Sequence, residues 1–358
     1  MRAMVSAVPL ISHTRRATVT ALALIAVAVS ACSGSTAGPA LRPLPAGVYA
    51  YLVNARTGDV RVIDTKTLRV VGDPIDVGAV PSEVAVSRDG TRAYVVRPMS
   101  NDIVVIDTAT RRVVGDPIKV GFYPSGVVVS PNGERIYVAD GESNDVRAFD
   151  TRTGRMMGQP LRVGDAPGGL ALSPDGTSIY VVSQYQNDVR MIDTDAWAVV
   201  GQVTVGDAPT SVALSPDGGR AYVADVNSGN VSVIDTNTKR VVGKPIKVGK
   251  YPTALVVSRD GLRLFVADQN SADVRVIDTR AMRVLGEPIR TGNAPAQLAL
   301  SPDGRRIYVA NMYSDDVSVI DTATLATTAT SGRIGSTPRG IALFALGVTI
   351  NPSTATRK

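Results

Sequence analysis

A short motif, Ile-Asp-Thr or Phe-Asp-Thr, recurs seven times along the 358-residue chain at an almost constant interval. Successive copies are separated by 43, 43, 43, 42, 43 and 43 residues, with the aspartates at Asp64, Asp107, Asp150, Asp193, Asp235, Asp278 and Asp321. A strand-rich unit of this length cannot bury both of its faces alone. Neighbouring units must therefore stack on one another, so that one repeated block accounts for most of the fold.

Each repeat contains four short segments with the composition of β-strands. In one complete copy these are residues 126–130, 135–139, 145–150 and 156–163, and the turn Ser130-Pro131-Asn132-Gly133 joins the first two. A proline before the first segment keeps the same period, at Pro81, Pro124, Pro167, Pro209, Pro252, Pro295 and Pro338. Short strands with regular turns are typical of an all-β propeller or sandwich.

The constant spacing favours a propeller, because radial stacking needs equal blades whereas a Greek-key sandwich needs unequal connections. We therefore predict an all-β fold, a seven-bladed β-propeller of four-stranded antiparallel blades. Apolar residues make up 44% of the chain and aromatic residues only 4%. The core must then consist mainly of Val, Ile, Leu and Ala.

The two ends of the repeat array complement each other. The first unit begins at its second strand, Val48–Asn54, and lacks a first strand of its own. The last unit ends with a surplus first strand, Gly340–Ala345. We predict that these two strands pair and close the ring, because closure removes the open sheet edges that invite aggregation.

The N-terminal region has the features of an export signal. Arg15 and Arg16 precede an apolar run, 17–29, that is short for a membrane span, and the run ends in Val29-Ser30-Ala31-Cys32. This sequence resembles the bacterial lipobox, which implies a signal peptide at 1–31 and diacylglyceryl modification of Cys32, the only cysteine. The alternatives are a secretory leader with an incidental cysteine and an uncleaved anchor.

The remaining boundaries follow from composition. Residues 32–47 are rich in Pro, Gly and small residues and are predicted to be a flexible tether, 48–346 the propeller, and 347–358 a polar tail. Two acyl chains hold a protein durably on a membrane. We therefore expect a lipid-anchored protein on the extracytoplasmic side of the cell membrane.

Charge and rare residues exclude several classes of function. The net charge is +6, and it becomes +3 once Arg2, Arg15 and Arg16 of the leader are removed. This small excess is interspersed, so no nucleic-acid partner is expected. The only histidine, His13, also lies in the leader. The processed chain would lack the imidazole that hydrolytic triads, haem ligation and histidine-based lyase chemistry require.

The repeats resemble a known family. Tyr308–Asn311 reads Tyr-Val-Ala-Asn and, with Ser-Pro-Asp-Gly, Val-Ile-Asp-Thr and Val-Gly-x-x-Pro at fixed offsets, is similar to the YVTN family of β-propeller repeats. The resemblance covers about residues 48–346. It implies the propeller fold and an extracytoplasmic location, and no particular activity. The motif's Asn is replaced in five copies, by Arg97, Asp140, Ser183, Asp225 and Asp268.

Features present in every repeat most simply build the blade. We expect each repeated aspartate to accept hydrogen bonds from the backbone of the turn that follows it. Recognition should instead use positions where the repeats differ. Such positions lie in two loops per repeat that share one face, and the predicted binding face comprises Arg97, Met99, Phe122, Tyr123, Tyr185, Tyr251, Met312 and Tyr313. The alternative is ordinary solvated loops.

We therefore expect a non-catalytic, monomeric binding propeller with a protein or envelope partner and neither cofactor nor metal site. The oxygen-rich loop 140–145 lacks the alternating order of a dedicated Ca²⁺ loop. The alternative function is a small-molecule-binding or hydrolytic, lactonase-like propeller that uses carboxylates at the axial funnel. Asp140, Glu142 and Asp225 are its candidate acid–base residues.

Overall fold

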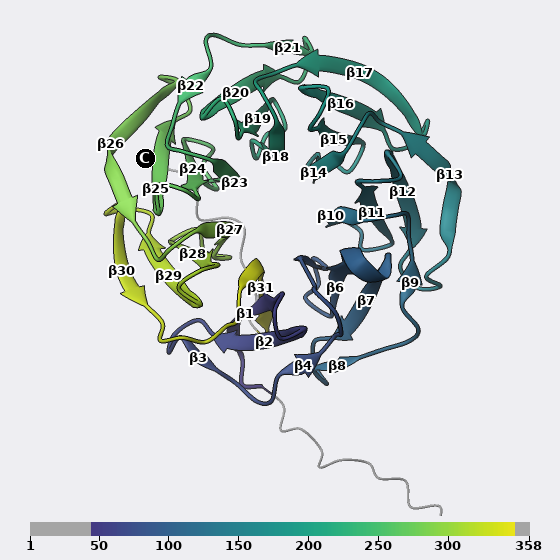
Figure 1. Cartoon of the computed structure of the whole chain (residues 1–358), viewed down its shortest axis with the longest axis vertical. Helices are drawn as coiled ribbons and strands as arrows, with labels where there is room; N and C mark the ends of the chain where they lie inside the picture. Colours follow the sequence, from purple (N-terminus) through teal and green to yellow (C-terminus); the bar gives the residue numbers. More distant parts are fainter. Residues whose placement is uncertain (1–43, 348–358) are drawn as a thin grey trace, which may run out of the picture. The chain divides into compact units, whose positions relative to one another are not determined.

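The computed structural model describes residues 44–347, which form seven antiparallel sheets arranged around a central axis (Figure 1). Each sheet is one blade, and blade 1 combines β31 with β1, β2, β3 and β4. Blades 2 to 7 follow in chain order and begin at β5, β10, β14, β18, β23 and β27. The prediction of an all-β, seven-bladed propeller of four-stranded blades is confirmed. The leader, Cys32, the tether up to residue 43 and residues 348–358 lie outside the described residues.

The inner strand of each blade lies next to the axis, and the second strand pairs with it. The inner strands are β31 (Pro338–Leu346), β5 (Glu83–Val86), β10 (Pro124–Val129), β14 (Pro167–Leu172), β18 (Pro209–Leu214), β23 (Pro252–Val257) and β27 (Pro295–Leu300). The second strands are β1 (Gly47–Asn54), β6 (Arg92–Arg97), β11 (Arg135–Asp140), β15 (Ser178–Ser183), β19 (Arg220–Asp225), β24 (Arg263–Asp268) and β28 (Arg306–Asn311).

The third strands are β2 (Asp59–Asp64), β7 (Asp102–Asp107), β12 (Asp145–Asp150), β16 (Asp188–Asp193), β20 (Asn230–Asp235), β25 (Asp273–Asp278) and β29 (Asp316–Asp321). Four blades have one continuous outer strand, namely β13 (Met156–Arg162), β17 (Ala198–Thr204), β26 (Arg283–Arg290) and β30 (Ala326–Thr330). In blades 1, 2 and 5 it is split into β3 (Arg69–Val70) and β4 (Ile75–Asp76), β8 (Arg112–Val113) and β9 (Ile118–Lys119), and β21 (Arg240–Val241) and β22 (Ile246–Lys247).

One short helix interrupts the strands, the 3₁₀ turn η1 (Pro98–Ser100) of blade 2. Within residues 44–347, no helix has the length and apolar character that a membrane span needs.

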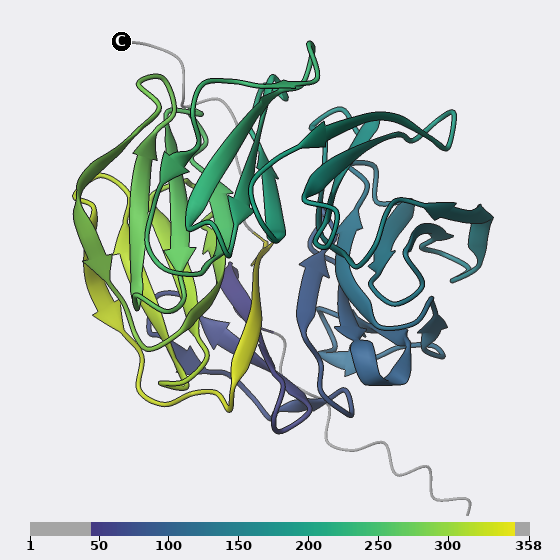
Figure 2. The same ribbon diagram turned by 45° about the horizontal axis from the view of Figure 1, so that its top comes forward.

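The hydrophobic core lies between neighbouring blades. One cluster joins Tyr94 and Ile103 of blade 2 to Val127, Ile136 and Phe149 of blade 3, and comparable clusters fill the other boundaries. The middle strands are buried along their length, whereas outer strands such as β13 are mostly exposed. The tilted view shows the sheets stacked side by side, with their connecting loops at the two faces of the ring (Figure 2). Stacking thus provides the burial that a single repeat lacks.

Closure of the ring occurs as predicted, because β1 pairs with β31 along its whole length, from Gly47 opposite Leu346 to Asn54 opposite Pro338. The ring of Phe344 stacks on that of Tyr51, with centroids 4.6 Å apart. The strand from the C-terminal end of the array therefore completes the blade that the N-terminal end leaves unfinished.

The seven repeated aspartates are structural, as expected. Each accepts a hydrogen bond from a backbone N–H three residues further on, as Asp150 does from Thr153 at 2.7 Å. The following threonine extends this network, since the Thr151 hydroxyl donates to the carbonyl of Gly133 in the turn between the first two strands of its blade. Hydrogen bonds from the backbone and hydroxyl of Thr238 hold the pKa of Asp235 below its usual value. These residues stabilise the turn that follows the third strand of each blade.

Candidate functional site

Two loops of each blade meet at one end of the ring. The first, the lead-in loop, ends at the proline that opens the inner strand, and the second is the hairpin after the second strand. In blade 3, Pro124 lies opposite Asp140, so the lead-in loop and the hairpin occupy the same end of the blade. We call the surface formed by these loops from all seven blades the loop face.

Hydrogen bonds connect the two loops within a blade. The backbone N–H of Phe122 donates to the hydroxyl of Ser143 at 2.7 Å, and the N–H of Gly141 donates to the carbonyl of Tyr123 at 2.8 Å. Blades 5, 6 and 7 repeat the serine contact through Ser228, Ser271 and Ser314. The side chains of the loop face therefore project from loops whose backbone is held in place by hydrogen bonds.

Hydrogen bonds also connect one blade to the next. The side-chain oxygen of Asn101 in blade 2 accepts the N–H of Tyr123 at 2.8 Å, and that of Asn144 accepts the N–H of Ala166 at 2.9 Å. The residue before the proline has a left-handed backbone in all seven blades, with φ from 45° to 63°. This conformation costs about 1–2 kcal/mol for a residue with a side chain. The network thus holds Tyr123 and Tyr251 in a backbone that they would not adopt alone.

Exposed aromatic residues gather on this face. Among residues 44–347, five aromatic side chains are exposed, and all five belong to the loop face: Phe122, Tyr123, Tyr185, Tyr251 and Tyr313. Tyr185 is 78% exposed, Tyr313 70% and Phe122 64%. Met99 is exposed beside them on η1, and Met312 is half-buried. The structure therefore places seven of the eight residues proposed from sequence at the same end of the ring, on five different blades.

Arg97 is the exception, because its guanidinium is already bound within the protein. It forms a two-pronged ion pair with Asp102, at 2.7 and 2.9 Å, and donates to the carbonyl of Val77 at 2.7 Å. Only 15% of its side chain is exposed. Arg97 therefore connects residues beneath the loop face and is not part of the exposed surface.

In each of the other six blades, the residue at the position equivalent to Arg97 is buried. Its equivalents are Asn54, Asp140, Ser183, Asp225, Asp268 and Asn311. In blade 3 this side chain lies under the glycine of the lead-in loop. A Cβ on Gly121 would lie 2.6 Å from the carboxyl of Asp140, so glycine is required there. The residues that differ between blades at this position therefore fill the same internal site in different ways.

In blades 3 and 6 this internal site holds two carboxyl groups and an arginine. Arg147 approaches Asp140 at 3.4 Å and Asp145 at 3.0 Å, and Arg275 approaches Asp268 at 3.5 Å and Asp273 at 3.8 Å. Burial raises the pKa of Asp268 to about 7, and the neighbouring charge of Asp273 adds to the effect. Burial likewise raises the pKa of Asp140. These pairs lie directly beneath the loops that carry Tyr123 and Tyr251.

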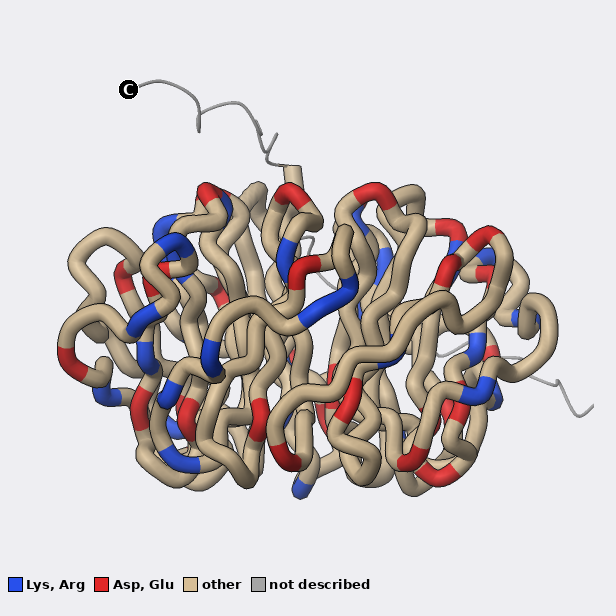
Figure 3. The backbone as a smooth tube through the Cα atoms, turned by 90° about the horizontal axis from the view of Figure 1, so that it is seen from above, with Lys and Arg blue, Asp and Glu red and all other residues tan. Residues whose placement is uncertain are grey.

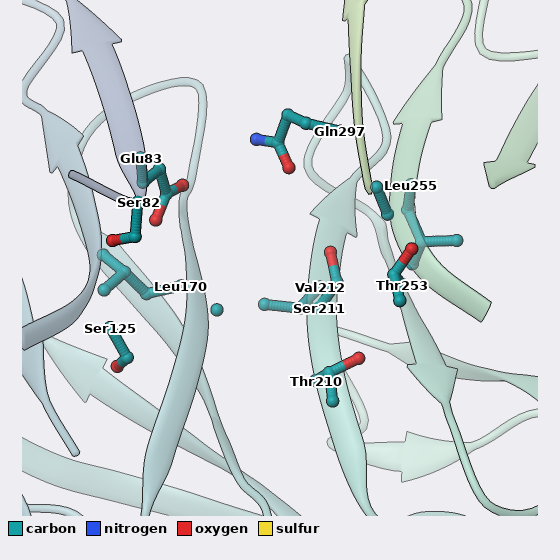
Figure 4. Close-up of a pocket in the computed structure, with 12 residues that line it drawn as sticks. Ser82, Glu83, Ser125, Leu170, Thr210, Ser211, Val212, Thr253, Leu255 and Gln297 are labelled. Atoms are coloured by element: carbon teal, nitrogen blue, oxygen red, sulfur yellow. The ribbon is translucent and has the colours of Figure 1, made fainter. Parts of the chain in front are cut away.

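The inner strands form a second candidate site at the axis, where the alternative function was expected, but its lining residues are not those named from the sequence. A cavity of about 260 Å³ is lined by residues of six inner strands and the loop before β5, among them Glu83, Ser125, Thr253 and Gln297 (Figure 4). Neither Asp140 nor Asp225 belongs to this lining, and Glu142 lies exposed on the loop face. Glu83 could have been found from the sequence, because it is the only acidic residue at the second position after the recurring proline in the seven repeats.

No metal centre is found in the described part of the chain, because no three Asp, Glu, His or Cys side chains within residues 44–347 converge on one point. The side view shows basic and acidic residues interspersed around the ring (Figure 3).

No protein-family model matches the chain, and no curated protein matches it by sequence. Solved structures do match. A functionally unknown protein from Desulfotomaculum acetoxidans is 18% identical with a TM-score of 0.72, over 83% of this chain and 99% of that one. Kuenenia stuttgartiensis hydrazine synthase is 22% identical with a TM-score of 0.66, over 74% and 92%.

A third structure, the dihydro-heme d1 dehydrogenase NirN, is 14% identical with a TM-score of 0.65, over 88% of this chain and 78% of that one. Identities this low carry information about the fold and none about the site. The chain is therefore similar to these three proteins in its β-propeller fold.

Proposed function

We propose that this protein is a non-catalytic binding propeller, anchored to the cell membrane through a lipidated Cys32, that recognises an envelope protein with its loop face. The observation that supports this most strongly is the collection, on that face, of all five exposed aromatic side chains of residues 44–347. Aromatic residues dominate the energetics of protein recognition, and a braced backbone lowers the entropy lost on binding.

The course of the chain suits an anchored protein. The described chain enters the ring through β1, whose first residue, Gly47, pairs with Leu346 at the end opposite the loop face. The tether would therefore attach to the opposite face. A lipid at Cys32 would leave the aromatic residues directed away from their own point of attachment. We also infer that the repeats are of the YVTN type, on the strength of the motif at Tyr308–Asn311.

Replacing Cys32 with alanine tests the anchor. The variant is expected to lose metabolic labelling with a fatty acid and to move from the membrane fraction to the soluble fraction, because the acyl chains supply the membrane affinity. Wild-type protein expressed in parallel is the control. A Cys32→Ala protein that remains labelled and membrane-bound would refute the lipid anchor.

Photo-crosslinking tests the loop face. A crosslinker at Tyr313 is expected to give one discrete adduct in intact membranes, and the double substitution Phe122→Ala/Tyr185→Ala should weaken it by about 30-fold or more, as loss of aromatic anchors does. The control Val113→Ala/Val200→Ala removes exposed apolar side chains from outer strands instead. Both doubles should keep the wild-type melting temperature. Equal adduct yields from the two doubles would contradict recognition through the loop face.

A further inference from the structure

Several residues that line the axial cavity occupy one repeated position, the second residue after the recurring proline. Five of the seven residues at this position belong to the lining, namely Glu83, Gly169, Ser211, Ala254 and Gln297, and the other two are Gly126 and Gly340. Glu83 is the only ionisable residue in the lining of the cavity, and within residues 44–347 it forms no ion pair.

Glu83 extends from blade 2 over the inner strand of blade 3. One carboxylate oxygen lies 3.5 Å from the place that a Cβ on Gly126 would occupy. Burial raises the pKa of Glu83 to about 8, and a hydrogen bond from the backbone N–H of Val127 partly offsets this. At neutral pH the group is therefore mostly protonated and lacks a counter-ion.

The other polar groups of the cavity are neutral, and some are unsatisfied. The hydroxyls of Ser82 and Thr210 are shielded from solvent and have no hydrogen-bond partner. By contrast, the Ser125 hydroxyl donates to the carbonyl of Pro167 at 2.6 Å and so ties blade 3 to blade 4. Gln297 reaches into the space from the side opposite Glu83 (Figure 4). The polar groups of the lining are therefore only partly paired within the protein.

The lining offers one group that can become charged, the carboxyl of Glu83, and it contains no Lys, Arg or aromatic residue. Each inner strand is the edge strand of its sheet, so backbone N–H and carbonyl groups along one edge have no partner within the sheet. A ligand that complements the one ionisable group would carry positive charge and at least one N–H donor.

The size of the cavity and the residues that line it favour an amine over a metal ion as the ligand. A space of about 260 Å³ is large enough for a small organic molecule. Ca²⁺ takes six to eight oxygen ligands, usually with several carboxylates, whereas one carboxyl group lines this cavity. A quaternary ammonium has no N–H to donate and is recognised by aromatic cages.

We propose that the axial cavity binds a small primary amine in its ammonium form, with the Glu83 carboxylate as its counter-ion and with the side-chain oxygen of Gln297 accepting a second hydrogen bond. This site lies at the start of the inner strands, next to the loop face, and it does not depend on the function proposed for that face. Binding displaces the proton of Glu83, so one proton is released per amine bound below pH 8.

Calorimetric titration with ethanolamine tests the proposal on the intact propeller. We expect saturable binding at a stoichiometry of one, with about one proton released at pH 7. Affinity should weaken about tenfold per pH unit below pH 8, because protons compete for the carboxylate. Glu83→Gln should weaken binding at least tenfold, while Glu142→Gln, the same substitution on the loop face, should leave it unchanged.

Two further ligands sharpen the test. Tetramethylammonium, with the same charge and no N–H donor, should bind at least tenfold more weakly than ethanolamine. CaCl₂ should give no Glu83-dependent heat. If Glu83→Gln fails to fold, Glu83→Gly replaces it, since blades 1, 3 and 4 carry glycine there. The proposal is overturned if ethanolamine fails to bind, if it binds the Glu83 variants as tightly as wild type, or if Ca²⁺ or tetramethylammonium is preferred.

Discussion

Ending the chain after Thr337 is expected to destroy cooperative folding of the propeller. This truncation removes β31, which forms the inner strand of blade 1 and pairs with β1 over its whole length. It also removes Ile341 and Phe344, both 3% exposed. Burial of each such side chain stabilises the folded state by about 1.5–3 kcal/mol. Without β31, the backbone N–H and C=O groups along one edge of β1 would also lose their partners. The total approaches the whole stability of a typical domain, about 5–15 kcal/mol.

A chain ending after Gly347 provides the matched control, because it keeps all of β31 and removes only residues 348–358. Thermal unfolding followed by circular dichroism should place the control near the full-length protein. The shorter chain should melt at least about 10 °C lower or accumulate as aggregate. Melting temperatures that agree within about 2 °C would show that the ring does not depend on pairing between its two ends.

Replacing Asp268 or Asp140 with asparagine is expected to stabilise the protein at pH 8. Blades 1 and 7 already use this chemistry, since the Asn54 amide donates to Asp59 at 2.6 Å and the Asn311 amide donates to Asp316 at 2.7 Å. In blades 3 and 6 the partner of the third-strand aspartate is instead a second carboxyl group, so ionisation places two like charges in a buried site.

The pH dependence follows from the raised pKa values. An aspartate in the unfolded chain loses its proton near pH 4, whereas Asp268 keeps its proton up to about pH 7. The folded state binds more protons in this window, so the free energy of unfolding falls as pH rises from about 4 to about 7 and stays low above it. Each Asp→Asn substitution should have little effect at pH 4. At pH 8 each should add about 2 kcal/mol, or about 5 °C in melting temperature.

The control for this series is Asp235→Asn, in a turn on the opposite face. Hydrogen bonds from Thr238 lower the pKa of Asp235, so its contribution to stability is present above pH 4 and is lost as pH falls through its folded pKa. Asp235→Asn should therefore lower the melting temperature at pH 8, the opposite of Asp268→Asn. The double Asp140→Asn/Asp268→Asn should show additive gains, because the two sites lie in different blades. Gains that are equal at pH 4 and pH 8 would refute raised pKa values as their cause.

The candidate site was only partly accessible from the sequence. Tyr185 and Tyr313 could be assigned to one face, because a hairpin after the second strand lies at the same end of every blade. Arg97 met the same criterion and is nevertheless engaged with Asp102 and Val77. Whether a loop arginine points outward or inward depends on partners in neighbouring strands and loops, which a pattern along the chain does not specify.

The 43-residue period was sufficient to determine the blade, the number of blades and the pairing of the last strand with the first, because each is a property of local strands that repeat. Tertiary structure alone decided what lies at the axis and beneath the loops. Glu83 acquires its raised pKa and its neighbours Gly126 and Val127 from a different blade, and Asp140 becomes buried only when the lead-in loop folds over it. The burial of Glu83 arises from contact between two blades, and that of Asp140 from a loop folding back within its own blade, so the spacing of residues along the chain specifies neither.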